Sequence, residues 1–328
     1  MSLRPVQPLV SPTESDRFPT LTLLQSRGMF LPIKQTLFLD DWAVDGKPVV
    51  LEFANAYLKV QWQHVALTQV HRNILDAMCS YMQPIYRAQG EVVFEFSLYE
   101  LYSYLMPPST RNASNKKFHL SNTDDLRQRL DELKTARFRV EDLVNQKVYS
   151  GRVGLSTGGE DPLERYGQTR ERFRLSPRFT EFWRHDVHVD LRKVLHHILA
   201  LKSCASQALA RSVLSNKFKS GQPLLKEFQD LGVVYAGLSR SAISNLVRQV
   251  KDDADGLSKL GIELRKTPTG ELGVFYEKLD AVRWQNGANN RVQLPLLDMP
   301  EGMPIAPLEG EVRPREFFKR ESRRSQGS

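Results

Sequence analysis

The chain has 328 residues, of which 41% are hydrophobic and 26% are charged, the balance of a soluble globular protein. This length is enough for two domains, each with a core of its own. Lys and Arg outnumber Asp and Glu by 46 to 38, a net charge of +8 that favours a polyanionic partner.

The placement of charge and cysteine narrows the class of protein further. Residues 191–260 contain 11 Lys or Arg and 5 Asp or Glu, so a net +6 falls in this stretch. The only cysteines, Cys79 and Cys204, are far apart in the sequence, which excludes a disulfide framework and a cysteine-rich zinc site. No apolar run approaches membrane-spanning length, and the N-terminus lacks a secretory apolar region. We therefore expect a cytoplasmic protein without a bound metal or cofactor.

The first domain is predicted to span residues 35–180, after a proline-containing flexible tail of residues 1–34. In chain order we expect strands at 49–53 and 57–62, a helix with Ile74, Met78 and Tyr81 on its buried stripe, an alternating strand at 91–96 and a helix at 98–105 capped by Ser97.

A third helix and a ribbon complete this predicted domain. Ser121 and Asp124 form a capping-box pattern that is expected to open a helix through Leu126, Leu130 and Leu133. The strands expected next, joined by a glycine-rich excursion over 151–167, are at 138–140, 148–153 and 172–175. Helices followed by a β-ribbon have the order of a winged-helix domain.

The second domain is predicted at residues 181–284, before a flexible tail at 285–328. Its expected elements are helices at 191–201 and 205–218, a short helix starting at Pro223, a longer helix from Ser239, and strands at 261–265 and 272–276 joined by Thr267-Pro268-Thr269-Gly270. The sequence therefore predicts an α+β, mainly α fold with two tandem winged-helix domains and flexible tails.

The helix from Ser239 is the candidate for reading DNA. The apolar residues expected at its buried stripe are Ile243, Leu246, Val247, Val250 and Ala254. The polar residues expected on or beside the opposite face are Ser241, Ser244, Asn245, Arg248, Gln249 and Lys251. Arg recognises guanine, Asn and Gln recognise adenine, and Ser contacts phosphate or base, so this face suits a major groove. The alternative is the solvated face of an ordinary amphipathic helix.

Other basic segments are candidates for phosphate contacts. Arg265 and Lys266 flank the turn of the second predicted ribbon, although simple solvation is an alternative there. In the first domain the candidates are Arg111, Lys116 and Lys117 in a loop, with Arg127 and Gln128 on the following helix. That helix also carries outward carboxylates, which repel phosphate. We therefore expect the first domain to position the protein on the DNA backbone and the second to carry more sequence information.

The order of these segments resembles the TrfA family of plasmid replication initiators. The resemblance spans about residues 35–280 and depends on the strand-to-helix segment VVFEFSLYELYSYL at 92–105, on LRQRLDELKTARFRV at 126–140, and on the Arg172-Phe173-Arg174 strand. It implies a tandem winged-helix protein of a bacterial cell that binds origin repeats (iterons) as a monomer, with dimers inactive or autoregulatory. It further implies melting of an A·T-rich segment and recruitment of host initiator, helicase and sliding clamp.

Two segments are similar to the Gln-Leu-x-Leu-Phe peptides with which bacterial replication proteins bind the sliding clamp. The first is Gln35-Thr36-Leu37-Phe38, which lacks the first Leu of that pattern. The second, with residues Gln293, Leu294, Leu296 and Leu297, lies in the C-terminal tail. The alternatives are that 37–39 is simply a first strand and that the tail segment docks on its own domain.

The sequence contains few of the motifs that identify enzymes. There is no P-loop and no Gly-x-Ser-x-Gly elbow. His185-x-x-His188 and His196-His197 do not have the spacing of rolling-circle nuclease ligands, and no cysteine pair or carboxylate cluster accompanies them. We expect a DNA-binding protein that is not an enzyme. A winged-helix transcriptional repressor is the alternative, and a nuclease with unusual ligands is a third.

Overall fold

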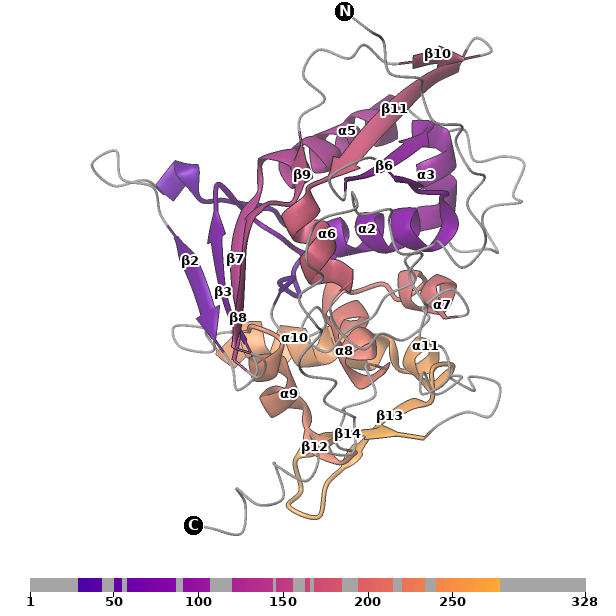
Figure 1. Ribbon diagram of the computed structural model, residues 1–328. Helices are drawn as coiled ribbons and strands as arrows, with labels where there is room; N and C mark the ends of the chain where they lie inside the picture. The colour runs from indigo at the N-terminus through magenta and orange to yellow at the C-terminus, as the bar shows by residue number, and fades with distance from the viewer. Residues whose placement is uncertain are drawn as a thin grey trace, which may run out of the picture. The chain divides into compact units, whose positions relative to one another are not determined.

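The computed structural model describes residues 29–42, 50–54, 58–86, 91–106, 120–143, 146–155, 163–165, 168–184, 194–214, 220–233 and 240–277. These residues form helices and small antiparallel sheets, which confirms the predicted α+β class (Figure 1). Three helices followed by antiparallel strands, the order predicted for each domain, occur twice along the chain.

The first occurrence is built on α2 (Gln69–Tyr81), α3 (Leu98–Leu105) and α5 (Leu120–Thr135). Strand β6 (Val92–Phe96) lies between α2 and α3 in the chain and pairs with β11 (Gln168–Leu175). The other strands of this sheet are β5 (Ile85–Tyr86), β9 (Gly154–Leu155) and β10 (Leu163–Arg165). The strand order is β10–β11–β6–β5, and β9 also pairs with β11. Ser97 caps α3 as expected, because its hydroxyl accepts a hydrogen bond from the Glu100 N–H at 3.1 Å.

A separate four-stranded sheet interrupts this first unit. Its order is β2–β3–β7–β8, from β2 (Leu51–Ala54), β3 (Leu58–Gln63), β7 (Arg137–Asp142) and β8 (Lys147–Arg152). The prediction that the strands at 138–140 and 148–153 belong to the same ribbon as the strand at 172–175 is therefore wrong. Strand β7 pairs with β3, from near the start of the described chain, while β11 pairs with β6.

The second occurrence follows the predicted order more closely. It comprises α7 (Leu195–Leu199), α8 (Cys204–Leu214), α9 (Leu224–Asp230), α10 (Arg240–Asp252) and α11 (Ala254–Ser258). The hairpin of β13 (Ile262–Lys266) and β14 (Leu272–Tyr276) is extended by β12 (Gln222–Pro223) into a sheet of order β12–β14–β13. This is the arrangement of a winged-helix unit, with α10 in the place of the reading helix and β13–β14 as the wing.

Two hydrophobic clusters underlie the two occurrences. The first extends from Met29 to Trp183 and includes fully buried aromatic side chains such as Phe94, and the second extends from Val194 to Val274. Burying each large apolar side chain contributes about 1.5–3 kcal/mol. The predicted boundary at residue 180 falls inside α6 (Pro177–Arg184), whose last residues still pack in the first cluster. The division into domains otherwise stays a prediction.

Three predicted details are corrected by the structure. The predicted N-terminal tail is too long, because Met29 and Phe30 are 0% and 2% exposed in the first cluster. Helix α5 begins at Leu120, so Ser121 lies inside it and is not its cap. The apolar stripe of the reading helix ends at Val250, since α10 stops at Asp252 and Ala254 is exposed at the start of α11.

A buried polar contact joins α2 of the first unit to α8 of the second. Arg211 of α8 is 1% exposed and donates hydrogen bonds to Asp76 Oδ2 at 2.9 Å, Gln69 Oε1 at 2.9 Å and Asn73 Oδ1 at 2.7 Å, all on α2. Burial lowers the pKa of Arg211 to about 10, against the opposing effect of Asp76, so the guanidinium is charged at neutral pH. We refer to Arg211 and its three partners on α2 as the α2–α8 junction.

Candidate nucleic-acid interface

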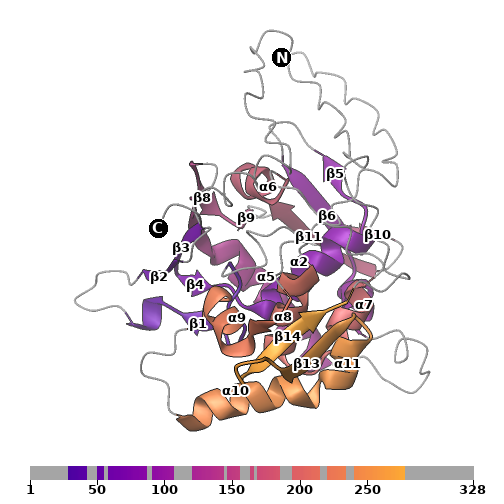
Figure 2. The ribbon, with the colours of Figure 1, turned by 90° about the horizontal axis from the view of Figure 1, so that it is seen from below.

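Helix α10 presents a continuous polar face to solvent. Of the predicted reading residues, the structure exposes Ser241, Ser244, Asn245, Arg248, Gln249 and Lys251. Among the described residues, neither Arg248 nor Asn245 has a side-chain partner. The helix lies along the lower edge of the view in Figure 2, on the same side as β13 and β14. The donors of Asn245 and Arg248 are thus available to a ligand.

The opposite side of α10 fixes the helix to the second cluster. Val250 is fully buried, and Leu246 and Val247 pack partly buried against the same cluster. Just beyond the helix, the Asp253 carboxylate accepts hydrogen bonds at 2.9 Å from the backbone N–H groups of Lys202 and Ser203, at the start of α8. The end of α10 is therefore held in a set position against the start of α8.

Sequence reasoning did not single out Arg240, which is exposed at the first residue of α10. It extends the polar face by one cation at the end of a reading helix that usually contacts bases. The signal was present in the sequence, because Arg240 directly follows the segment expected to introduce this helix.

The two predicted cations of the wing differ in their contacts with neighbouring side chains. Arg265 lies over the ring of Phe275, 4.6 Å from the centroid, and pairs with Glu263 at 3.1 Å, although it stays largely exposed. Lys266 is exposed next to the turn, where Gly270 has a φ of +85° that favours glycine. The turn thus offers one ordered guanidinium and one ammonium group at its base.

The candidates in the first unit are less available. Arg127 pairs with Glu171 at 3.1 Å and lies 4.0 Å from Asp124, while Gln128 donates to Glu132 at 3.0 Å. Arg111, Lys116 and Lys117 lie outside the described residues. Helix α5 therefore has its polar donors engaged by its own neighbours, unlike α10.

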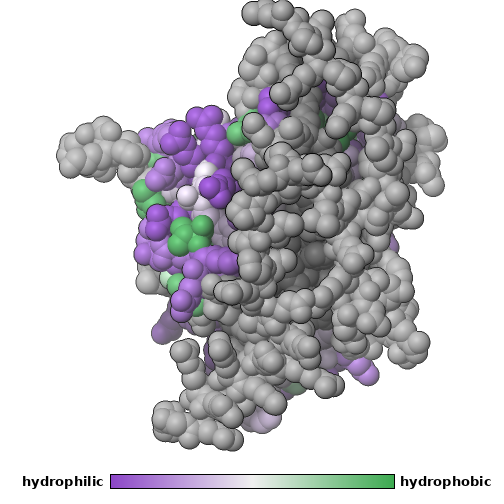
Figure 3. Space-filling view, in the orientation of Figure 1, coloured by the Kyte–Doolittle hydropathy of each residue, from purple (hydrophilic) through white to green (hydrophobic). Residues whose placement is uncertain are grey.

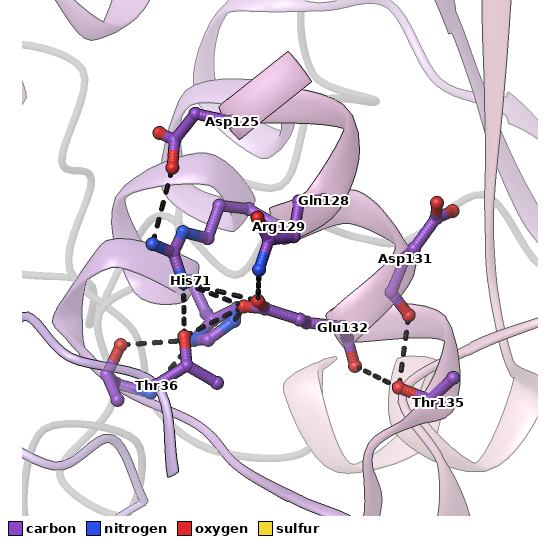
Figure 4. A network of polar contacts seen from close by, with 9 residues as sticks. Thr36, His71, Asp125, Gln128, Arg129, Asp131, Glu132 and Thr135 are labelled. Atoms are coloured by element: carbon purple, nitrogen blue, oxygen red, sulfur yellow. Dashed lines mark hydrogen bonds and ion pairs between the residues drawn. The ribbon is translucent and has the colours of Figure 1, made fainter. Parts of the chain in front are cut away.

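The partner of Gln128 belongs to a buried network that ties three segments together. Figure 4 shows the side chains of Thr36, His71, Gln128 and Arg129 converging on the carboxylate of Glu132. Thr36 donates to it at 2.9 Å and His71 Nε2 donates at 2.8 Å, because His71 Nδ1 accepts the Thr68 N–H. Arg129 also hydrogen-bonds the Thr36 hydroxyl. The network fixes α5 to α2 and to the segment before β1 (Leu37–Phe38).

This network favours a neutral His71 ring beside an ionised Glu132 carboxylate. Burial lowers the pKa of His71 and thus favours the neutral ring. Burial alone raises the pKa of Glu132, but the hydrogen bonds from His71, Thr36 and Arg129 outweigh it and lower that pKa to about 2. The arrangement is a structural anchor with every oxygen of the carboxylate occupied.

The predicted clamp-binding residues fall in different parts of the chain. Leu37 and Phe38 form β1 (Leu37–Phe38), which pairs with β4 (Val65–Ala66), so these two residues are a strand in the structure. Clamp binding by this segment stays a prediction. Gln35 is exposed and Phe38 is 39% exposed, whereas Leu37 packs partly buried against the first cluster. Gln293, Leu294, Leu296 and Leu297 lie outside the described residues.

Metal and membrane sites have no basis in the described residues. No group of three or more His, Cys, Asp or Glu is placed there so as to hold a metal. The rings of His196 and His197 lie 3.9 Å apart, while His185 and His188 are outside the described residues. Within the described ranges, no helix has the length and apolar character needed to cross a bilayer.

The order of elements and the exposed polar helix define an α+β protein of winged-helix type. No family model matches the chain, and no curated protein matches it. Among solved structures, the chain is similar to a crystal structure of domains 2 and 3 of RctB, with a TM-score of 0.43, 12% identity, and 79% of this chain and 99% of that chain covered. A second RctB structure of domains 2–3 gives a TM-score of 0.42 and 12% identity, over 78% of this chain and 97% of that one. Membership of the TrfA family stays a prediction.

Proposed function

We propose that this chain is a sequence-specific double-stranded DNA-binding protein that reads the major groove with α10. The wing of β13 and β14 contacts the adjacent backbone through Arg265 and Lys266. The observation that carries this proposal is the two-sided character of α10: Val250 is sealed in the core, while Asn245 and Arg248 are exposed without protein partners in the described chain.

The chemistry of this face supports direct readout of bases. An Arg side chain forms two hydrogen bonds with guanine O6 and N7, and an Asn side chain forms two with adenine N6 and N7. Arg248 and Asn245 are three residues apart in one helix, so they lie on neighbouring turns of the same face. Exposed serines beside them suit phosphate contacts that set the register.

Selection of bound duplexes from a random pool is the direct test. A recurring site should emerge from the pool, and Arg248→Ala should weaken binding to it by about 1–3 kcal/mol while relaxing the preference at one base pair. The matched control is Arg178→Ala, which removes an exposed cation of α6 that already pairs with Glu181. An equal loss of affinity on cognate and random duplexes would reduce Arg248 to a phosphate contact.

We further propose that the DNA sites are repeats at a replication origin and that the protein recruits host replication proteins. This finer function is supported by the resemblance to TrfA-type initiators and by the clamp-like segments at both ends of the chain. A winged-helix repressor is the second candidate, favoured by the same α10 face. Directly repeated selected sites, together with capture of a purified sliding clamp, would support the initiator; a single palindromic site without clamp binding would support the repressor.

A further inference from the structure

The outer face of the sheet β2–β3–β7–β8 carries an unusual row of side chains. In register, Gln63 of β3 lies opposite Arg137 of β7, and Arg137 lies opposite Arg152 of β8. All three residues are exposed. Because opposite residues in an antiparallel pair point to the same side, they form one row of hydrogen-bond donors across three strands, with neighbouring strands about 5 Å apart. We call this the Gln63–Arg137–Arg152 row.

The two cations of this row differ from the other cations on the same face. Lys59 pairs with Glu52 at 3.1 Å, and Arg139 pairs with Glu141 at 3.0 Å. Neither Arg137 nor Arg152 has an acidic partner anywhere in the described part of the chain. After the other cations are neutralised, the net positive charge of this face is therefore concentrated at one end of the sheet.

Placing two arginines opposite each other without an acid is unfavourable for the free protein. Like charges directly opposite in a sheet destabilise it, whereas an opposite charge at either position would stabilise it. The other side of the same strands is core: Trp62 and Phe138 are 1% and 3% exposed, so the alternation fixes both arginines toward solvent. An anion bound between the two guanidinium groups would turn this repulsion into attraction.

The surroundings of the row favour a polyanion over a protein surface. Hydrophilic side chains gather over this sheet, at the left of Figure 3, with only isolated apolar side chains among them. A protein interface would be expected to have a more apolar centre with few charges. Duplex DNA, by contrast, carries one phosphate per strand for about every 3.4 Å of helix axis, and arginine binds phosphate oxygens through two parallel hydrogen bonds.

We propose that the Gln63–Arg137–Arg152 row binds the phosphate backbone of duplex DNA, as a contact separate from the base-reading face of α10. This proposal rests on the proposed DNA-binding function and extends it to a third surface, on the sheet β2–β3–β7–β8. The row adds affinity and salt dependence without sequence preference, because phosphates carry no base information.

The test is the salt dependence of DNA binding by the full chain. The double variant Arg137→Gln/Arg152→Gln should lower the slope of log affinity against log salt by about 2, since each phosphate contact contributes about 0.9. The advantage of the unaltered protein over this variant should accordingly shrink about tenfold between 50 and 200 mM salt. The base preference of the selected site should not change.

The control is Arg178→Gln/Lys134→Gln, which removes the same charge from cations on α6 and α5 that already pair with Glu181 and Asp131. It should change the slope much less. The thermal unfolding midpoint of Arg137→Gln/Arg152→Gln in the absence of DNA should not fall, because the substitution removes repulsion; a variant with that midpoint is folded, and its binding result is decisive.

The outcomes separate this inference from the proposed function. If the unaltered protein binds no duplex at any salt concentration, the proposed function itself fails. If it binds a selected site through Arg248 while the row variant and the control have equal slopes, only the phosphate contact is overturned. Equal slopes together with a changed mass in sedimentation equilibrium would assign this face to a second copy of the chain instead.

Discussion

Substitution of Arg211 by Ala should strongly destabilise the protein, because it removes the centre of the α2–α8 junction. Three polar contacts at 2.7–2.9 Å are lost, and Asp76, only 1% exposed, loses one of its two cations. Removing one member of a buried ion pair usually costs about 3–5 kcal/mol. Arg72 still pairs with Asp76 at 2.8 Å, so we expect a value near the lower end, about 3 kcal/mol.

Urea unfolding followed by circular dichroism measures this loss. The control is Arg178→Ala, whose pair with Glu181 is exposed on both sides and should contribute less than about 1 kcal/mol. A double-mutant cycle between Arg211 and Asp76 should give a coupling of at least about 1 kcal/mol. If Arg211→Ala costs no more than the control, the junction does not stabilise the fold and the buried contact has been overvalued.

Three further changes have defined outcomes. Lowering the pH should destabilise the fold in two stages. The first begins below about pH 6.5, where the unfolded chain protonates His71 more readily than the folded chain does, and the second lies between about pH 4.5 and 2, where Glu132 is protonated; each proton changes the free energy of unfolding by at most about 1.4 kcal/mol per pH unit. Glu132→Gln should flatten the second stage in pH-dependent urea unfolding. Gly273→Ala should destabilise the wing by about 1–3 kcal/mol in thermal unfolding, because the new Cβ would lie 2.5 Å from Thr267 Cγ2, and an unchanged midpoint would contradict that contact. Phe38→Ala should lower the midpoint only modestly, because the residue is 39% exposed and its burial is partial. It should nevertheless abolish capture of a sliding clamp; retained capture would move the clamp-binding prediction to the C-terminal segment.

Local periodicity predicted most of the elements of the candidate interface. The spacing of Leu246, Val247 and Val250 indicated which side of α10 is buried, and the structure agrees. The turn from Thr267 to Gly270 marked the wing, and β13 and β14 flank it as expected. Both features depend on residues close together in the chain, so the sequence alone was sufficient to find them.

Long-range pairing was not accessible in the same way. The alternation of apolar and polar residues around Phe138 predicted a strand, but nothing local showed that β7 pairs with β3, so that Val60 lies opposite Val140 across 80 positions of chain. The Gln63–Arg137–Arg152 row was missed for this reason, since it exists only once three distant strands are in register. The N-terminal segment was misjudged because its prolines masked the apolar pair Met29 and Phe30.

The polar side chains of α5 and α10 differ in how available they are for base contacts, because their neighbours differ. On α5, the donors of Arg127 and Gln128 are already bound by Glu171 and Glu132, so reading a base would first require breaking those contacts. On α10, Arg248 meets no such competitor in the described chain, and base contacts replace water alone. A base contact that replaces an existing protein contact, as on α5, contributes little net free energy, whereas one that replaces only water, as on α10, contributes more. Sequence-specific recognition therefore favours α10. The second unit is therefore the one whose substitution should change which DNA sequence is bound, while substitutions in the first unit should change how tightly any duplex is held.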